Sequence, residues 1–180
     1  PCKFGIEEGD IMKNHIGLQT SYWNGTTPKL DIFQVIDLTK KAGMDIIELK
    51  AGDFVPLTKK ERKELRTYIE DAGLKITING TGLRPERDVS NSDPEVHEAG
   101  VNHLCYMLDL AEEMGARYFS GIPYGLWNTR PEGDPIAKVK EIRTQNAVRG
   151  LKKVARHAQE VGVILCLEIV NRFEQYIANT

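Results

Sequence analysis

Residues 40–49 read KKAGMDIIEL, in which a helical pattern ends, a glycine follows and a short apolar run begins. The same junction recurs as EDAGLKITIN at 70–79, EEMGARYFSG at 112–121 and QEVGVILCLEIV at 159–170. The glycines of the four copies are Gly43, Gly73, Gly115 and Gly162. Glycine is favoured just past a helix end because it adopts a positive φ without a Cβ clash. The repeat therefore predicts helices that each lead directly into a strand.

The segments before these glycines carry the start signals of helices. Thr27 is expected to be the N-cap of the first helix, with Pro28 at its first helical position. Residues 58–61 read TKKE, which has the form of a capping box for the second helix. The third helix is expected to begin near Asp93, and the fourth near Val139.

Five short apolar runs are expected to be strands: 16–20, 45–49, 75–78, 118–121 and 163–170. Strands that alternate with single helices imply right-handed crossovers and a parallel sheet. The alternation predicts an α/β protein of the (β/α)₈ TIM-barrel class. An open doubly wound sheet is the second reading, but no G-x-G-x-x-G follows the first strand. A small five-stranded α/β domain is the third.

A complete (β/α)₈ barrel typically needs about 250 residues. The chain has 180 residues and five expected strands, so only about the first five β/α units are expected. Residues 1–11 are interpreted as an N-terminal extension, and residues 12–180 as the N-terminal portion of a single TIM-barrel domain. The remaining strands are expected from a longer chain or from another chain, and the 180 residues alone are expected to be inactive.

The composition is that of a globular enzyme, with 41% hydrophobic and 28% charged residues. A formal net charge of −2 and the lack of a basic run predict no nucleic-acid partner. No apolar stretch reaches the roughly 18 residues of a membrane span, so no membrane partner is expected. The cysteines, Cys2, Cys105 and Cys166, show no C-x-x-C spacing, which favours a cytoplasmic location.

Glu168 is the strongest candidate for a functional residue, because functional groups in parallel α/β folds gather at the C-terminal ends of the strands. It lies in the last expected strand, where period two places it on the face of Cys166 and Val170. A buried ionised carboxylate is costly unless it meets a metal or a cation. The alternative is a structural ion pair with Arg172 or another base. The polar cluster at 171–174 either recognises substrate hydroxyls or caps a helix.

Other candidates follow the remaining strands. Glu48 ends the second strand, and the alternative for it is a rim ion pair. Tyr22 and Trp23 follow the first strand and Trp127 follows the fourth; such aromatics either stack on a sugar or plug a barrel mouth. Gly80 lies in the NGTG turn after the third strand and would allow a ligand to approach the backbone closely.

The histidines lie away from the strand ends at which a metal site is expected. His15 precedes the first strand, whereas His97, His103 and His157 fall in expected helices. Stable divalent sites usually need three or more protein ligands. Glu168 is therefore the one credible metal ligand in the sequence, and the other ligands are expected from outside it.

These motifs resemble those of a known family. Residues 167–180, LEIVNRFEQYIANT, are similar to the segment around the fifth strand of the D-tagatose/D-allulose (psicose) 3-epimerases, members of the xylose-isomerase-like TIM-barrel superfamily. Shorter matches are SYW at 21–23, GMDIIEL at 43–49, ITINGTGL at 76–83 and SDP at 92–94. The resemblance covers the chain from about Met12 onward.

The resemblance implies a metal-dependent isomerase that interconverts free ketohexoses at carbon 3 through an enediolate. Glu168 would be both a metal ligand and one of two acid/base carboxylates, and Glu174 would hydrogen-bond the substrate. Trp23 would form part of the pocket wall, with Gly80 and Trp127 as further substrate-binding residues. The metal would be Mn²⁺, with Mg²⁺ or Co²⁺ as replacements. The partner would be a small-molecule ketose, and the complete protein would be a homo-oligomer.

Two alternative functions remain, one a related enzyme and the other a protein without catalytic activity. A hydroxypyruvate isomerase, an inosose dehydratase or a pentulose-phosphate 3-epimerase would share the barrel and the metal, but should lack the VNRFE run. A non-catalytic fragment or binding half would take up no stoichiometric divalent ion, so a metal titration separates it from the enzymes.

Overall fold

Strands and helices alternate along the chain as the sequence predicts. The computed structural model describes residues 14–25, 29–130, 132–133, 135–171 and 173–177, so the extension expected at 1–11 lies outside the described residues. The elements are β1 (Gly17–Gln19), the 3₁₀ helix η1 (Thr20–Gly25), α1 (Ile32–Lys41), β2 (Ile46–Lys50), α2 (Ala51–Phe54), α3 (Lys59–Asp71), β3 (Lys75–Asn79), α4 (Pro94–Glu113), β4 (Tyr118–Gly121), α5 (Ile136–Val161) and β5 (Ile164–Leu167). Among the described helices, none is both long and apolar enough to span a membrane.

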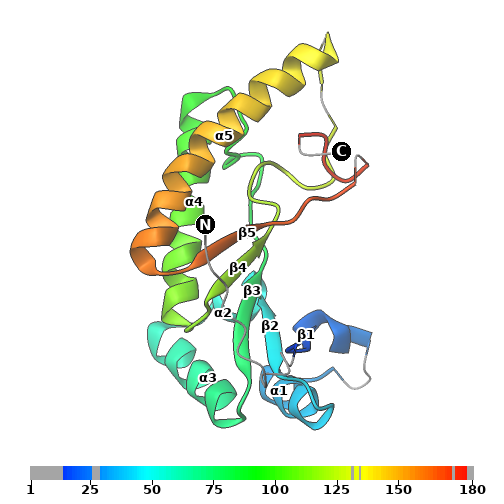
Figure 1. Cartoon of the computed structure of the whole chain (residues 1–180), viewed down its shortest axis with the longest axis vertical. Helices are drawn as coiled ribbons and strands as arrows, with labels where there is room; N and C mark the ends of the chain where they lie inside the picture. Colours follow the sequence, from blue (N-terminus) through cyan, green and yellow to red (C-terminus); the bar gives the residue numbers. More distant parts are fainter. Residues whose placement is uncertain (1–13, 26–28, 131, 134, 172, 178–180) are drawn as a thin grey trace, which may run out of the picture.

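The strands form one parallel sheet in the order β1-β2-β3-β4-β5. Each strand pairs with the next along the chain, and the long helices α4 and α5 lie side by side on the outside of the sheet (Figure 1). A doubly wound sheet would reverse its strand order at a switch point. The strictly sequential order is instead that of the first five strands of a (β/α)₈ barrel.

The two faces of the sheet differ in chemistry. Side chains such as Ile47, Leu49 and Phe119 are 0% exposed and belong to the core between the sheet and the helices. Residues that pair across the parallel ladder point to the same face of the sheet, and successive residues of a strand point to opposite faces. The opposite, barrel-interior face carries mostly polar side chains, including Gln19, Glu48, Lys50, Thr77, Asn79 and Ser120. The interior of the barrel can therefore contact a polar ligand.

The predicted glycines past the helix C-termini and two of the predicted helix starts are confirmed. The four glycines of the repeated junction have φ values of 78°, 71°, 71° and 74° in chain order. Thr58 and Glu61 form the predicted capping box of α3, and the Asp93 carboxylate accepts hydrogen bonds from the first turn of α4.

The predicted start of the first helix is wrong. The helix begins at Ile32, and its N-cap is Asp31, whose carboxylate accepts from the backbone N–H of Gln34 at 2.9 Å. The Gln34 side chain accepts in return from the Asp31 backbone at 3.0 Å. This reciprocal cap satisfies two backbone donors. Thr27 and Pro28 lie outside the described residues.

The last strand is shorter than the predicted 163–170. β5 pairs only with β4, and the ladder ends where Gly121 meets Leu167. Within the described residues β5 is an edge strand, and Ile164, Leu167 and Ile169 are 42%, 46% and 58% exposed. Glu168 therefore lies just past the strand with an exposed side chain, and the expectation that it sits inside a buried strand is wrong.

Candidate functional site

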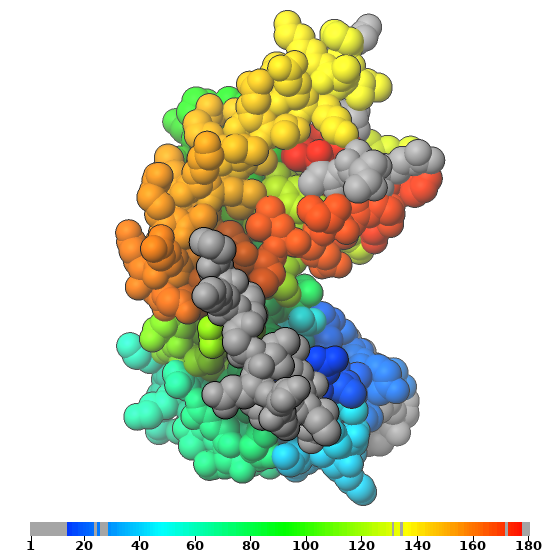
Figure 2. Space-filling model, viewed as in Figure 1, coloured from blue at the N-terminus to red at the C-terminus, as the bar shows by residue number. Residues whose placement is uncertain are grey.

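An open cavity of about 1280 Å³ lies at the C-terminal ends of the strands. The space-filling view shows the surface hollowed between the blue N-terminal part and the red C-terminal segment (Figure 2). Its lining residues are Gln19, Thr20, Ser21, Lys29, Leu30, Asp31, Ile32, Val35, Lys50, Ala51, Gly52, Asp53, Asn79, Gly80, Trp127 and Glu168. Because all five strands are parallel, the residues that follow them lie at one rim, and Gly80, Trp127 and Glu168 line this cavity there.

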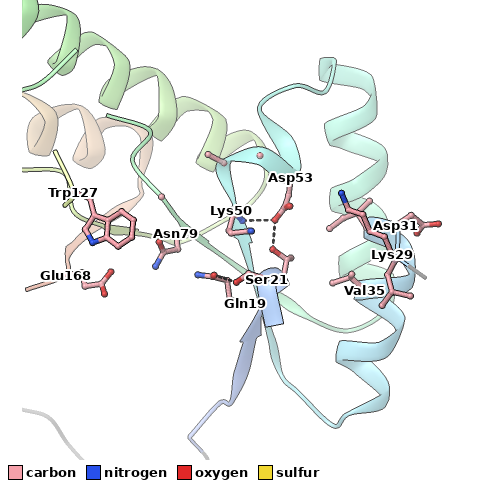
Figure 3. A pocket seen from close by; sticks show the side chains of 16 residues that line it. Gln19, Ser21, Lys29, Asp31, Val35, Lys50, Asp53, Asn79, Trp127 and Glu168 are labelled. Atoms are coloured by element: carbon pink, nitrogen blue, oxygen red, sulfur yellow. Dashed lines mark hydrogen bonds between the residues drawn. The ribbon is translucent and has the colours of Figure 1, made fainter. Parts of the chain in front are cut away.

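Glu168 and Trp127 form one side of this cavity. Figure 3 shows them across from Lys29, Asp31 and Val35, with Asn79 beside them. A smaller cavity of about 380 Å³ shares Asn79, Gly80, Trp127 and Glu168 with the larger one and adds Glu174. The structure thus brings together four of the predicted site residues: Gly80, Trp127, Glu168 and Glu174.

The backbone of Glu168 is held from the β4 side. Its N–H donates to the carbonyl of Gly121 at 2.8 Å, and its carbonyl accepts from the hydroxyl of Tyr124 at 2.8 Å. Tyr124 is 2% exposed. Arg172, named in the alternative of a structural ion pair with Glu168, lies outside the described residues.

Glu174 is joined to the loop that carries Trp127. Its carboxylate accepts from the side-chain amide of Asn171, and its backbone carbonyl accepts from the N–H of Asn128 at 2.6 Å. Trp127 is 61% exposed, so the indole is open to a ligand. The carboxylate and the indole therefore belong to two segments that are hydrogen-bonded to each other.

Trp23 is placed differently from the other candidates. Its indole N–H donates to the hydroxyl of Thr39 on α1 at 3.1 Å, and its ring packs edge-on against Tyr22 with centroids 5.1 Å apart. Trp23 packs against the core and is not among the described residues that line the cavity. Its neighbours Thr20 and Ser21 line the cavity instead, and a role for Trp23 in the pocket wall stays a prediction.

Glu48 takes part in a hydrogen-bonded chain below the cavity. It accepts from the side-chain amide of Gln19 at 2.8 Å, and Ser21 donates to the Gln19 carbonyl oxygen. Within the described residues no cation lies at ion-pair distance from Glu48, so the alternative of a rim ion pair finds no support there. These hydrogen bonds orient the side-chain amide of Gln19, which lines the cavity.

The turn after β3 is supported by a histidine that sequence reasoning passed over. Nε2 of His103 lies 2.9 Å from the carbonyl oxygen of Thr81, so this nitrogen must carry the proton. Burial lowers the pKa of His103, and the positive charge of Arg87 adds to this effect. A Cβ on Gly82 would lie 2.9 Å from Nε2, so a side chain at Gly82 would displace the ring. His103 thus fixes the turn that contains Gly80.

The described residues do not form a metal site by themselves. No three histidine, cysteine, aspartate or glutamate side chains within the described ranges come together in a way that could hold a metal ion. Glu168 would supply one ligand, and a stable divalent site usually needs three or more protein ligands.

Comparison with known proteins identifies relatives over most of the chain. The model of the xylose isomerase-like TIM barrel family matches residues 36–180. An L-ribulose 3-epimerase of Mesorhizobium japonicum is 31% identical over 92% of this chain and 52% of its own length. A D-psicose 3-epimerase of Ruminiclostridium cellulolyticum is 27% identical over 91% of this chain and 54% of its own length.

A solved structure of a relative has the same fold as this chain. A D-psicose 3-epimerase from Clostridium cellulolyticum, crystallised with D-tagatose, superposes with a TM-score of 0.81 at 25% identity, covering 93% of this chain and 56% of that one. The predicted fold class is thereby confirmed, as a partial barrel. The chain spans about half the length of the curated relatives it matches.

Proposed function

Since the chain belongs to the xylose isomerase-like TIM barrel family, we propose that it forms part of a metal-dependent ketose 3-epimerase acting on free ketohexoses. The observation that carries this proposal is the meeting of Glu168, Trp127, Gly80 and Glu174 around adjoining cavities at the C-terminal rim. The relatives named as ketose 3-epimerases, which match over nine-tenths of this chain, support it.

The proposed reaction needs a base beside carbon 3. The hydrogen on this carbon is made weakly acidic by the neighbouring ketone, and its removal gives an enediolate. Glu168 accepts the proton, because its carboxylate is exposed at the cavity where the carbon chain of a sugar would lie. A second carboxylate, from outside the described residues, returns a proton to the opposite face.

The remaining groups bind and orient the sugar. Trp127 offers an exposed ring for the apolar face of the carbon chain, and the amides of Asn79 and Gln19 can hydrogen-bond hydroxyl groups. Glu174 accepts a hydrogen bond from a substrate hydroxyl, with its carboxylate steadied by Asn171. These groups hold carbon 3 against Glu168, and such positioning accounts for a large part of the rate enhancement of enzymes.

A bound metal ion is proposed only for the complete protein. Glu168 would be its ligand from this chain, and the other ligands would come from residues outside it. An oxygen-rich set favours Mn²⁺, with Mg²⁺ or Co²⁺ as replacements, and a bound divalent ion would stabilise negative charge on the sugar oxygens. A homo-oligomeric state and a cytoplasmic location belong to the same proposal; Cys105 and Cys166 are free thiols, as a reduced compartment requires.

The test is a substrate survey with the complete natural protein. D-Tagatose, D-fructose and D-allulose are incubated with enzyme and Mn²⁺ in deuterated water, and the product is analysed for epimer and for deuterium at carbon 3. Epimer formation with deuterium incorporation supports the proposal. Turnover of phosphorylated pentuloses alone would replace it with a pentulose-phosphate 3-epimerase.

A further inference from the structure

We infer that Tyr124 is a positioning residue that sets the backbone of Glu168. Its hydroxyl joins the loop at 122–128 to the segment at 168–177, so that Glu168, Glu174 and Trp127 are held as one unit. This inference rests on the proposed function, since it concerns the residues that perform it. Tyr124 itself is not among the residues that line the two cavities at the rim.

Glu168 depends on Tyr124 because it lies beyond the end of β5. On the β4 side the β5 ladder ends where Gly121 meets Leu167, so the hydroxyl of Tyr124, and not a strand residue, binds the carbonyl of Glu168. Among the described residues, the backbone of Glu168 makes two hydrogen bonds, one from its N–H to the carbonyl of Gly121 and one that Tyr124 donates to its carbonyl, each 2.8 Å long. Removing the second leaves the backbone of Glu168 held at its N–H but not at its carbonyl.

The direction of the Tyr124 hydroxyl is itself fixed by packing. The ring is 2% exposed and lies in a small apolar cluster, separate from the main core, with Ala147 of α5 and Ile177 of the C-terminal segment. Ile122 and Leu151 pack against the same cluster. A ring held by a helix and by both segments cannot rotate its hydroxyl away from Glu168 without opening the cluster.

Two further contacts join the same segments. The buried side chain of Gln175 donates to the carbonyl of Leu126 at 2.7 Å, and the N–H of Asn128 donates to the carbonyl of Glu174 at 2.6 Å. At Gly125 a Cβ would lie 2.9 Å from Nε2 of Gln175 and 3.0 Å from Cδ1 of Ile177. A side chain at this position would therefore have to displace the side chains of Gln175 and Ile177.

The test compares Tyr124→Phe with Tyr68→Phe in the complete natural protein. Both variants lose one tyrosine hydroxyl, but Tyr68 donates to Asp37 at 2.9 Å on the helical surface away from the rim. Tyr124→Phe is expected to lower kcat about tenfold with little change in KM, because a displaced base slows proton transfer more than it weakens binding. Tyr68→Phe is expected to keep both constants.

Hydrogen exchange, measured without substrate or metal, provides the second readout. Tyr124→Phe should speed amide exchange within 168–177 at least severalfold and leave β2 and β3 unchanged. Unchanged exchange at 168–177 would overturn the inference, as would faster exchange spread over the whole chain, which would mean a general structural role. If the wild-type protein exchanged no carbon-3 proton on any ketose, the proposed function would fail, while the exchange comparison would still decide whether Tyr124 holds this segment.

Discussion

Replacing Glu168 by glutamine tests the proposed chemistry most directly. The change keeps the volume of the side chain but removes the negative charge and the base. Glu168 is exposed among the described residues, and no described side chain donates a hydrogen bond to its carboxylate, so the free energy of unfolding measured without metal should change by less than about 0.5 kcal/mol. Any large loss of activity can then be assigned to chemistry.

The magnitude follows from the hydrogen bonds that already engage the other carboxylates of the larger cavity. Of the other carboxylates lining the larger cavity, Asp31 caps α1, and Asp53 accepts from Thr20 at 2.6 Å and from the Lys50 backbone at 2.8 Å. Both are occupied, so neither replaces Glu168. General acid–base catalysis contributes about 10²–10⁴-fold, which is about 2.7–5.4 kcal/mol in the activation barrier. Glu168→Gln should therefore lower kcat at least a hundredfold.

The assay follows two signals in the complete natural protein with Mn²⁺ present. Epimerisation of D-tagatose and D-allulose is measured by product analysis, and exchange of the carbon-3 proton with deuterated water by mass spectrometry. Both should fall in parallel, because they depend on the same proton removal, and bound metal should also decrease. Wild-type exchange together with full metal occupancy in Glu168→Gln would refute the role of Glu168 as base and ligand.

Three further predictions concern binding, stability and pH. Glu174→Gln should raise KM for the ketose about tenfold and leave metal content unchanged, as checked by kinetics and metal analysis; a loss of metal would contradict its role in substrate binding. The Asp88 carboxylate is 1% exposed and lies 3.0 Å from the guanidinium of Arg143, so Arg143→Ala leaves it without its cation. Urea unfolding should show that the free energy of unfolding falls by about 2–3 kcal/mol. The decrease is smaller than for a fully buried pair because Arg143 is partly exposed. The pKa of His103 is lowered on folding, so the unfolded chain binds its proton first as pH falls below about 6.5, and the free energy of unfolding should decrease there. His103→Gln should flatten this part of the pH profile, and an identical slope in the variant would exclude His103 as its source.

Local sequence alone determined the alternation of strands and helices. A capping box such as Thr58–Glu61 and a positive φ at Gly43 or Gly162 depend on residues within one or two turns, so these features can be inferred from spacing. The parallel sheet and the common rim follow from the alternation itself, because each crossover returns the chain in the same direction. The placement of Glu168, Trp127 and Gly80 at one rim was predictable for this reason.

Tertiary structure decided how the rim residues are held. The position of Glu168 past the end of the β4–β5 ladder depends on how these two strands pair, which no local pattern indicates. Trp23 turns toward Thr39 because α1 packs beside it. Tyr124 and His103 reach Glu168 and Thr81 across 44 and 22 residues of chain. Contacts between residues this far apart form only when the sheet and helices have packed, so the sequence determined which groups reach the rim, and packing determined how their backbones are fixed there.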